Sequence, residues 1–470
     1  MNAEMPIRAA PYAHQIAAFH AALAAFVSGQ SQGYGLLFEM GCGKTITAIA
    51  VAGSLHLTQK IHRVLIVAPL SIVGVWREEF AKFADFDYTL AVLIGSGAKK
   101  ADTLRHLAGT PLQVAVVNYE SAWRLEKEIA AWKPDLIIAD EGHKIKNHTT
   151  SAAKAMHRLG AKAAYRLLLT GTPVTNRAID IFSQYKFLNS AIFGNSFYSW
   201  RNRYFDMCGY GQHTPVLKRT MESELTRKMH SIAFRATKAE CLDLPSTTDI
   251  IRTVELEPAA AKTYRALVKE SCAELAGGEI TATNILTRLL RLSQLTGGFI
   301  GVDGERPTQI STSKLDALSD IIEEAINSGQ KLVIIARFVP EIAAIKRLLE
   351  KASIGYAAIS GETKDRAEQV KQFQENPNVM VFVGQIATAG LGITLTAASM
   401  MVFYSEDYSM SNFEQAKARI HRVGQTQPCT YIYLAAKNTV DEKILKSLRD
   451  KADLAKTLVD DYRNGNNPFG

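Results

Sequence analysis

A glycine-rich stretch near the start of the chain has residue types that could hold a phosphate group. Met40-Gly41-Cys42-Gly43-Lys44-Thr45 follows an apolar run over 34–38 and opens a helix-compatible segment over 45–57. Glycines let backbone N–H groups approach a phosphate closely, and a helix N-terminus supplies partial positive charge. In that setting Lys44 can reach the β- and γ-phosphates of a nucleotide, and the Thr45 hydroxyl can bind Mg²⁺. The first glycine of the full phosphate-loop pattern is replaced by Phe38.

Two consecutive carboxylates follow another apolar run, over 136–139, in the sequence Asp140-Glu141-Gly142-His143. Asp140, at the expected strand end, is suited to the shell of a Mg²⁺ ion, because hard cations prefer oxygen ligands. Glu141 is suited to orient and deprotonate a water molecule for in-line attack on a γ-phosphate. Together the two motifs predict a site that hydrolyses a nucleoside triphosphate.

The elements that must position these motifs are visible as short apolar runs bounded by turn signals. Most of the early runs are continuous rather than alternating, which is typical of strands buried on both faces of a parallel sheet. They lie at 34–38, 63–68, 114–117, 136–139 and 166–170. Helix-compatible stretches such as 45–57 and 149–159 separate them. This βαβα pattern predicts a doubly wound α/β domain.

The strand pattern stops near residue 176, gives way to mostly helical periodicity, and resumes in the second half. The later runs lie at 331–336, 357–360, 379–383, 401–404 and 430–434. We therefore expect two α/β lobes, the first over 1–240 with a helical insertion at about 176–240. The second covers 241–470 with a helical segment at about 256–300, and Leu244-Pro245-Ser246-Thr247-Thr248 is the expected hinge.

The composition is that of a globular protein. Its 470 residues suggest two to four domains of about 100–200 residues each. Five cysteines without a CxxC pair argue against a disulfide scaffold or a zinc ribbon and favour a reducing compartment. No apolar run approaches the ~18 residues of a membrane-spanning helix. The apolar stretch Ile16–Val27 is interpreted as a buried or amphipathic helix rather than a signal sequence.

Positive charge is concentrated in one part of the chain. The formal net charge is +8, whereas Glu141–Glu240 alone contains 16 Lys and Arg against 6 Asp and Glu. Such an excess predicts a polyanionic partner, because lysine and arginine displace counterions from phosphates; a solvated basic face is the alternative. Aromatic rings among these cations suit stacking on nucleic acid, with core packing as the alternative for most of them. They are Tyr198, Trp200, Tyr204 and Phe205, beside Arg201 and Arg203.

In their order along the chain, these and further segments resemble the motifs of Swi/Snf-type superfamily 2 helicase-like ATPases. In the first half they are Pro11–Gln15 (Q motif), Gly41–Thr45 (I), Ala68–Ser71 with Trp76 (Ia), Asn118–Glu120 (Ib), Asp140–His143 (II) and Leu169–Pro173 (III). In the second half they are Val333–Phe338 (IV), Thr388–Thr394 (V) and Gln415–Gln425 (VI). The His-Arg-Val-Gly-Gln ending of motif VI is highly specific to that family. Ser360–Thr363 and the form of motif V resemble its annealing-helicase branch and its compact phage or prophage members.

The resemblance implies two tandem RecA-like lobes that hydrolyse ATP with Mg²⁺ in the cleft between them and act on DNA, with double-stranded DNA favoured. It implies arginine fingers at Arg419 and Arg422, which share a helix face if that segment is helical. It implies nucleotide contacts for Gln15, Gly41, Cys42, Gly43, Lys44, Thr45, Gly392 and Gln415. It implies DNA contacts or coupling for Ser71, Asn118, His143, Thr170, Thr172, Arg337 and Thr394. Arg288 and Arg291 are further candidates for contacts with the DNA backbone.

We expect a monomer without a membrane anchor, bacterial or phage-encoded, that works on DNA in the cytoplasm. Three activities remain open: translocation on double-stranded DNA, strand separation or annealing at forked DNA, and an ATP-gated DNA-binding scaffold. Strand separation needs a pin or wedge element, which the sequence does not reveal. A scaffold with little motor activity has no need of Lys44, Glu141 and both arginines together.

Overall fold

The computed structural model describes residues 4–70, 72–109, 111–171, 178–208, 214–241, 243–277, 282–301, 307–361, 363, 365–386 and 393–455. Within these residues the chain divides into two compact units. One comprises the residues up to Asp243 together with residues 451–455, and the other runs from Leu244 to Asp450. The predicted hinge begins at this division. Its last two residues, Thr247 and Thr248, instead start a strand of the second unit, so the predicted hinge extends too far.

The first unit is built on a parallel sheet of seven strands in the order β3-β4-β2-β5-β6-β1-β9. The strands are β1 (Gly33–Phe38), β2 (Arg63–Ala68), β3 (Tyr88–Val92), β4 (Leu112–Asn118), β5 (Leu136–Asp140), β6 (Tyr165–Leu169) and β9 (Ala233–Ala236). All residues of β1, β4 and β5 are buried, as expected for strands covered on both faces. Parallel pairing through β6 brings the carboxyl ends of β1 and β5 to one edge of the sheet.

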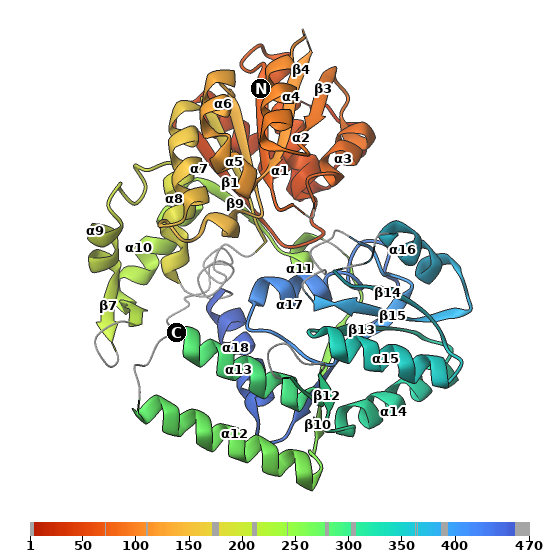
Figure 1. The fold of residues 1–470 in the computed structure, drawn as a ribbon. Helices are drawn as coiled ribbons and strands as arrows, with labels where there is room; N and C mark the ends of the chain where they lie inside the picture. The colour runs from red at the N-terminus through yellow and green to blue at the C-terminus, as the bar shows by residue number, and fades with distance from the viewer. Residues whose placement is uncertain are drawn as a thin grey trace. The chain divides into compact units, whose positions relative to one another are not determined.

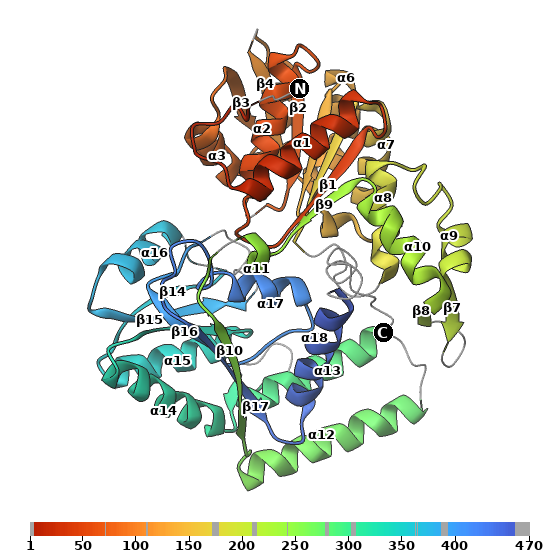
Figure 2. The ribbon, with the colours of Figure 1, turned by 180° about the vertical axis from the view of Figure 1, so that it is seen from behind.

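Helices cover both faces of this sheet, as the two opposite views show (Figures 1 and 2). One face buries side chains of α1 (Ala13–Val27), α2 (Lys44–Leu57) and α3 (Val75–Phe83). The other buries side chains of α4 (Gly97–His106), α5 (Tyr119–Arg124), α6 (Glu126–Trp132), α7 (Ser151–Lys162) and α8 (Ile181–Leu188). Local sequence sets the helix starts: the Thr150 hydroxyl caps α7 by accepting from the Ala153 N–H.

The interval predicted as a helical insertion also contains strands. Helices α9 (Phe197–Tyr204) and α10 (Arg219–His230) accompany an antiparallel hairpin of β7 (Phe205–Cys208) and β8 (Thr214–Leu217). The chain then returns to the main sheet as β9, which pairs with β1, and continues into α11 (Lys238–Cys241). These strands are only four residues long, so they lack the extended apolar run that identifies a strand from sequence.

The second unit contains a parallel sheet of six strands in the order β10-β17-β16-β13-β15-β14. The strands are β10 (Thr247–Val254), β13 (Lys331–Ala336), β14 (Gly355–Ile359), β15 (Val379–Gln385), β16 (Ala398–Phe403) and β17 (Cys429–Ala436). One face packs against α14 (Ser313–Asn327) and α15 (Val339–Lys351). The other packs against α16 (Arg366–Glu375), α17 (Met410–Lys417) and α18 (Val440–Ala455). The helical segment consists of α12 (Pro258–Gly277) and α13 (Ala282–Thr296), and β11 (Phe299–Ile300) pairs with β12 (Thr308–Gln309).

The predicted fold class, two doubly wound lobes with parallel sheets, is confirmed. Three strands of the two main sheets were not expected, β3, β9 and β10, and all three lie at sheet edges. β3 is mostly half-buried and β10 mostly exposed, so neither shows the continuous apolar run of a central strand. Across the described residues, no helix is both long enough and apolar enough to cross a membrane.

Candidate active site

The loop between β1 and α2 depends on two glycines. Gly41 and Gly43 have φ angles of 88° and 85°, in the left-handed region that favours glycine. A Cβ at Gly43, the N-cap of α2, would lie 2.1 Å from Gln15 Nε2. Lys44, the first residue of α2, donates from Nζ to the Phe38 carbonyl oxygen at 3.1 Å. The loop therefore joins a helix N-terminus to a lysine held over the end of β1, a suitable arrangement for phosphate.

Two side chains of α1 hold this loop in place. The carbonyl oxygen of Cys42 lies 2.7 Å from His14 Nε2 and accepts from Gln15 Nε2 at 3.3 Å. Gln15 also accepts from the Tyr12 N–H at 3.0 Å and is only 4% exposed. Gln15, which the resemblance implies as a nucleotide contact, is thus also a contact of the loop itself. Burial raises the pKa of the Cys42 thiol to about 12, so this thiol remains neutral.

Asp140 ends β5 with a buried carboxylate. Its Oδ2 accepts from the Trp76 indole N–H at 3.0 Å, and its Oδ1 accepts from the Glu141 backbone N–H at 2.9 Å. Burial, and then the neighbouring Glu141 carboxylate, raise the pKa of Asp140 to about 7, whereas the charge of Lys44 lowers it. Lys44 and Asp140 therefore interact electrostatically, which joins the two predicted motifs in one site.

Glu141 has a left-handed backbone, with φ of 49° and ψ of 56°. This conformation costs a residue other than glycine about 1–3 kcal/mol and is concentrated at functional sites. The Glu141 carboxylate is buried, and its Oε2 lies 3.3 Å from His143 Nδ1. Just before it, the Tyr119 hydroxyl donates to the Asp140 carbonyl oxygen at 2.7 Å and fixes the strand end. The Glu141 and His143 side chains of motif II therefore lie next to each other at the carboxyl edge of the sheet.

Two predicted coupling residues of the first unit lie at other strand ends. Asn118, at the end of β4, donates from Nδ2 to Glu120 Oε2 at 2.8 Å. Thr170 follows β6 and is fully buried, and its N–H donates to the Leu36 carbonyl oxygen at 3.2 Å. A role of Thr170 in coupling would therefore act through its neighbours. Outside the described residues lie Ser71, Thr172, Gly392 and the side chain of Arg288.

The two candidate arginine fingers lie after α17 rather than on it. The helix ends at Lys417 and residues 418–424 form turns and bends, so the predicted shared helix face is wrong. The two guanidinium groups nevertheless converge, because Nη1 of Arg419 and Nη1 of Arg422 each donate to the Ile393 carbonyl oxygen at 3.4 Å. The next residue, Thr394, is partly buried. A single carbonyl group therefore orients both arginines.

Two glutamines stabilise this region. Gln415 is buried in α17 and donates to Ser411 Oγ at 3.4 Å. Gln425 Nε2 donates to the carbonyl oxygens of Thr396 at 3.3 Å, Ala398 at 2.8 Å and Ile420 at 3.1 Å. Its Oε1 accepts from the next two backbone N–H groups. Gln425 thus holds the arginine turn against the segment that leads into β16, a role that the motif pattern alone does not reveal.

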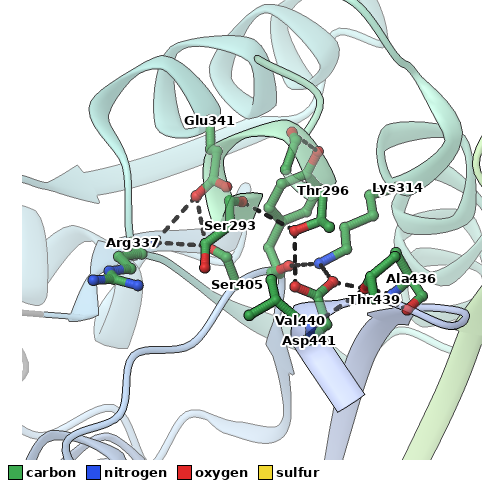
Figure 3. A network of polar contacts seen from close by, with 12 residues as sticks. Ser293, Thr296, Lys314, Arg337, Glu341, Ser405, Ala436, Thr439, Val440 and Asp441 are labelled. Carbon is green, nitrogen blue, oxygen red and sulfur yellow. Dashed lines mark hydrogen bonds and ion pairs between the residues drawn. The ribbon is translucent and has the colours of Figure 1, made fainter. Parts of the chain in front are cut away.

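Arg337, the motif IV candidate, follows β13 beside a buried polar network (Figure 3). Its N–H donates to Ser405 Oγ at 2.8 Å and to Glu341 Oε2 at 3.2 Å. The Ser405 hydroxyl also donates to the Glu341 carboxylate. The guanidinium group points away from these residues (Figure 3) and lies 5.0 Å from the Phe338 ring. The network therefore fixes the backbone of Arg337 and leaves its charge outside.

The network continues to Lys314, which is only 2% exposed. Its Nζ lies 2.7 Å from Asp441 Oδ2 and donates to the Tyr404 carbonyl oxygen at 3.0 Å. Burial raises the pKa of Glu341 to about 7 and that of Glu406 to about 8. Sequence reasoning did not identify this cluster, because its members come from five separate helices and strand ends.

Most rings of the basic stretch belong to the core. The buried ones are Trp200, Tyr204 and Phe205. Tyr198 is 65% exposed, and the Arg201 guanidinium carbon lies 5.3 Å from its ring centre. Arg203 is paired with Glu224 at 3.0 Å. The core interpretation is therefore confirmed for three rings, and Tyr198 with Arg201 is the cation–ring pair that faces solvent.

Two family models match this chain. The model for the SNF2-related domain matches residues 17–296, and the model for the helicase conserved C-terminal domain matches residues 313–424. The chain is 25% identical over 442 residues to a chromodomain-helicase-DNA-binding protein 1-like of Danio rerio, covering 90% of this chain and 42% of that protein. It is 27% identical over 431 residues to an uncharacterized ATP-dependent helicase of Mycoplasma genitalium, covering 90% and 40%.

A solved structure of the Sulfolobus solfataricus SWI2/SNF2 ATPase core in complex with dsDNA is 27% identical, covers 98% of this chain and 95% of that chain, and has a TM-score of 0.46. The chain spans about two fifths of the length of the two curated relatives. The match to the SNF2-related domain extends over more than half of the chain. The chain therefore belongs to the SNF2-related family.

Proposed function

We propose that the chain binds ATP with Mg²⁺ at the β1–α2 loop and hydrolyses it to move along double-stranded DNA. The observation that carries this proposal is the meeting of Lys44 with Asp140 and Glu141 at the carboxyl edge of one parallel sheet. Open α/β sheets bind their ligands at that edge. Family membership supports the same conclusion, since the Mycoplasma genitalium relative is named an ATP-dependent helicase.

The residues present fit a magnesium-bound triphosphate. The left-handed glycines and the N-terminus of α2 form a turn suited to phosphate oxygens. Thr45 and Asp140 offer the hydroxyl and carboxylate oxygens that Mg²⁺ prefers. Bound magnesium would neutralise charge on the phosphates during transfer.

Each side chain then has a separate task. Lys44 leaves its carbonyl partner on Phe38 and pairs with the β- and γ-phosphates. Glu141 orients a water molecule and takes its proton as general base, a role that its fixed backbone supports. His143, whose Nδ1 lies 3.3 Å from that carboxylate, would couple hydrolysis to events outside the site.

The second unit would supply a further cation to this site. Arg419 and Arg422 would neutralise the charge that develops on the γ-phosphate, a contribution of about 10³–10⁵ in rate. Because both arginines belong to the unit that starts at Leu244, hydrolysis requires that unit to close on the nucleotide. Repeated closure and opening, with each unit holding the DNA backbone in turn, would move the protein along the duplex.

DNA binding is supported by charge. The excess of positive charge over Glu141–Glu240, which includes the buried Arg166 and Arg235, suits a phosphate backbone, and the exposed Tyr198 ring beside Arg201 adds a stacking surface. The named ligand of the Sulfolobus solfataricus structure is double-stranded DNA. We therefore favour duplex over single strands as the partner.

The proposal is tested by measuring ATP turnover with duplex DNA, single-stranded DNA, RNA and no nucleic acid, at increasing salt. We expect duplex to stimulate turnover at least as well as a single strand, and the stimulation to fall steeply with salt because phosphate contacts release counterions. Triplex displacement without strand displacement would support translocation. Strand displacement or annealing of forked DNA would instead indicate a helicase. An ATP turnover rate that DNA does not change at low salt would favour an ATP-gated scaffold.

A further inference from the structure

Arg235 is a buried arginine beside the phosphate loop, on β9 at the edge of the first sheet. It is 6% exposed and pairs in register with Leu37 of β1. Its Nη1 donates to the carbonyl oxygens of Leu37 at 2.9 Å and Gly171 at 3.2 Å. Its Nη2 donates to Glu39 Oε1 at 3.2 Å. One guanidinium group on β9 therefore contacts two segments that are distant in the sequence, residues 37–39 and Gly171.

Two of these contacts lie next to the lysine of the phosphate loop. Leu37 precedes Phe38, whose carbonyl oxygen accepts from Lys44 Nζ. A Cβ at Gly171 would lie 3.1 Å from that oxygen and 3.6 Å from Lys44 Nζ. The end of β1 and Gly171 therefore both lie close to the lysine, and Arg235 donates to a carbonyl group in each of these two segments.

The third contact leads toward the second unit. Glu39 Oε2 accepts from the Lys238 N–H at 2.9 Å, and the Glu39 N–H donates to the Ala236 carbonyl oxygen at 2.9 Å. These bonds connect the start of the phosphate loop to residues 237–241, which follow β9 and contain α11 and which we call the exit segment. That segment leads to the boundary of the first unit at Asp243. A shift of the phosphate loop on nucleotide binding would therefore move the exit segment through these bonds.

We infer that Arg235 is a positioning residue for ATP hydrolysis, which sets Lys44 through the two carbonyl groups and connects the phosphate site to the exit segment through Glu39. The inference rests on the proposed function, because it assigns a role in that reaction. A planar guanidinium group suits this task, since its donors are fixed in one fork, whereas lysine offers only a point charge.

Arg166 provides a matched control within the same sheet. It is likewise a buried arginine, and it donates from Nη1 to the Gly160 carbonyl oxygen at 2.8 Å and from Nη2 to Gln32 Oε1 at 2.9 Å. It pairs in register with Gly33, at the start of β1, whereas Arg235 lies near the end of that strand. The two arginines are equally buried in the fold but sit at opposite ends of β1.

The experiment compares Arg235→Lys, Arg166→Lys and Glu39→Gln with the unchanged full chain. It measures the thermal midpoint, the Kd of a fluorescent ATP analogue, and kcat and KM for ATP with and without duplex DNA. For Arg235→Lys we expect weaker nucleotide binding and a kcat lower by about 10- to 100-fold, the size of effect produced by a misplacement of about 1 Å. For Arg166→Lys we expect a similar change in the thermal midpoint and unchanged kcat and nucleotide Kd. For Glu39→Gln we expect near-normal nucleotide binding with reduced stimulation by DNA.

The inference is overturned if Arg235→Lys and Arg166→Lys have the same nucleotide Kd and the same kcat, because Arg235 would then serve folding alone. If the unchanged chain binds the analogue but shows no turnover with any DNA, the proposed function fails instead. The nucleotide Kd of the two lysine variants then decides the role of Arg235 by itself.

Discussion

Arg419 and Arg422 share one hydrogen-bond acceptor, the carbonyl oxygen of Ile393, each at a distance of 3.4 Å. Two like charges are thereby held together in a turn rather than spaced along a helix. Like charges repel, so this proximity costs electrostatic free energy that neighbouring groups must offset. The arrangement is consistent with a site prepared for a phosphate.

We predict that Arg422→Ala lowers DNA-stimulated ATP turnover by about 10³-fold while ATP and DNA still bind, because the lost cation acts on the reacting phosphate. The measurement is kcat with saturating duplex beside the two dissociation constants. Arg347→Ala, which removes an exposed arginine on α15, is the control and should leave kcat unchanged. Near-normal stimulated turnover in Arg422→Ala would remove the arginine from the mechanism.

Lys44→Ala and Glu141→Gln should both abolish turnover but by different routes. Loss of Lys44 removes the point charge on the phosphates, so ATP binding should weaken. Glu141→Gln removes only the base, so ATP should bind and remain unhydrolysed. Equilibrium binding of ATP to both variants distinguishes these outcomes, and an equal loss of affinity would contradict the assigned roles.

The Trp76–Asp140 hydrogen bond should matter for both stability and the site. Trp76→Phe keeps most of the apolar contact but removes the donor to a buried carboxylate, which should cost about 1–3 kcal/mol in the free energy of unfolding. Trp132→Phe is the matched control, because the Trp132 Nε1 has no hydrogen-bond partner among the described residues. Denaturant unfolding of the two variants gives the comparison. Equal losses would show that the indole N–H contributes nothing.

Stability should fall as the pH rises, owing to the buried network around Lys314. Burial raises the pKa of Glu341 from 4.5 to about 7, so the folded chain binds a proton that the unfolded chain has lost. This stabilisation is complete below pH 4.5 and is lost as the pH rises through 7, and it amounts to about 3 kcal/mol. Glu341→Gln cannot titrate and should show a smaller fall in the free energy of unfolding between pH 5 and 8. The slopes of the two curves provide the test, and parallel slopes would contradict it.

Much of the site could be predicted because its motifs coincide with local structure. Asp140 ends one buried strand, Lys44 starts the helix after another, and a parallel sheet brings such strand ends to one edge. The runs that form β1, β2, β5 and β13 are continuous and apolar, so burial on both faces is visible in the sequence.

The remaining features depend on contacts between distant segments. The convergence of Arg419 and Arg422 is set by the carbonyl group of Ile393, about 26 residues earlier, and not by helical spacing. Arg235 contacts Leu37 across 198 residues of sequence. Neither relationship leaves a periodic pattern, since each joins segments that are far apart in the sequence. Ile393 precedes β16 and the arginine turn follows α17, whereas Leu37 and Arg235 lie on paired strands.

The bonds of Gln425 have a consequence for synthesis. Its side-chain amide donates to the carbonyl oxygens of Thr396 and Ala398. The turn that carries both arginines is therefore completed only when residue 425 has left the ribosome. A nascent chain that stops a few residues earlier already contains every charged group of the site but lacks the Gln425 amide, whose hydrogen bonds hold the arginine turn. In the order of emergence, the arginine turn can therefore be completed only once residue 425 is available, while β17 and α18 of the same unit follow later in the chain.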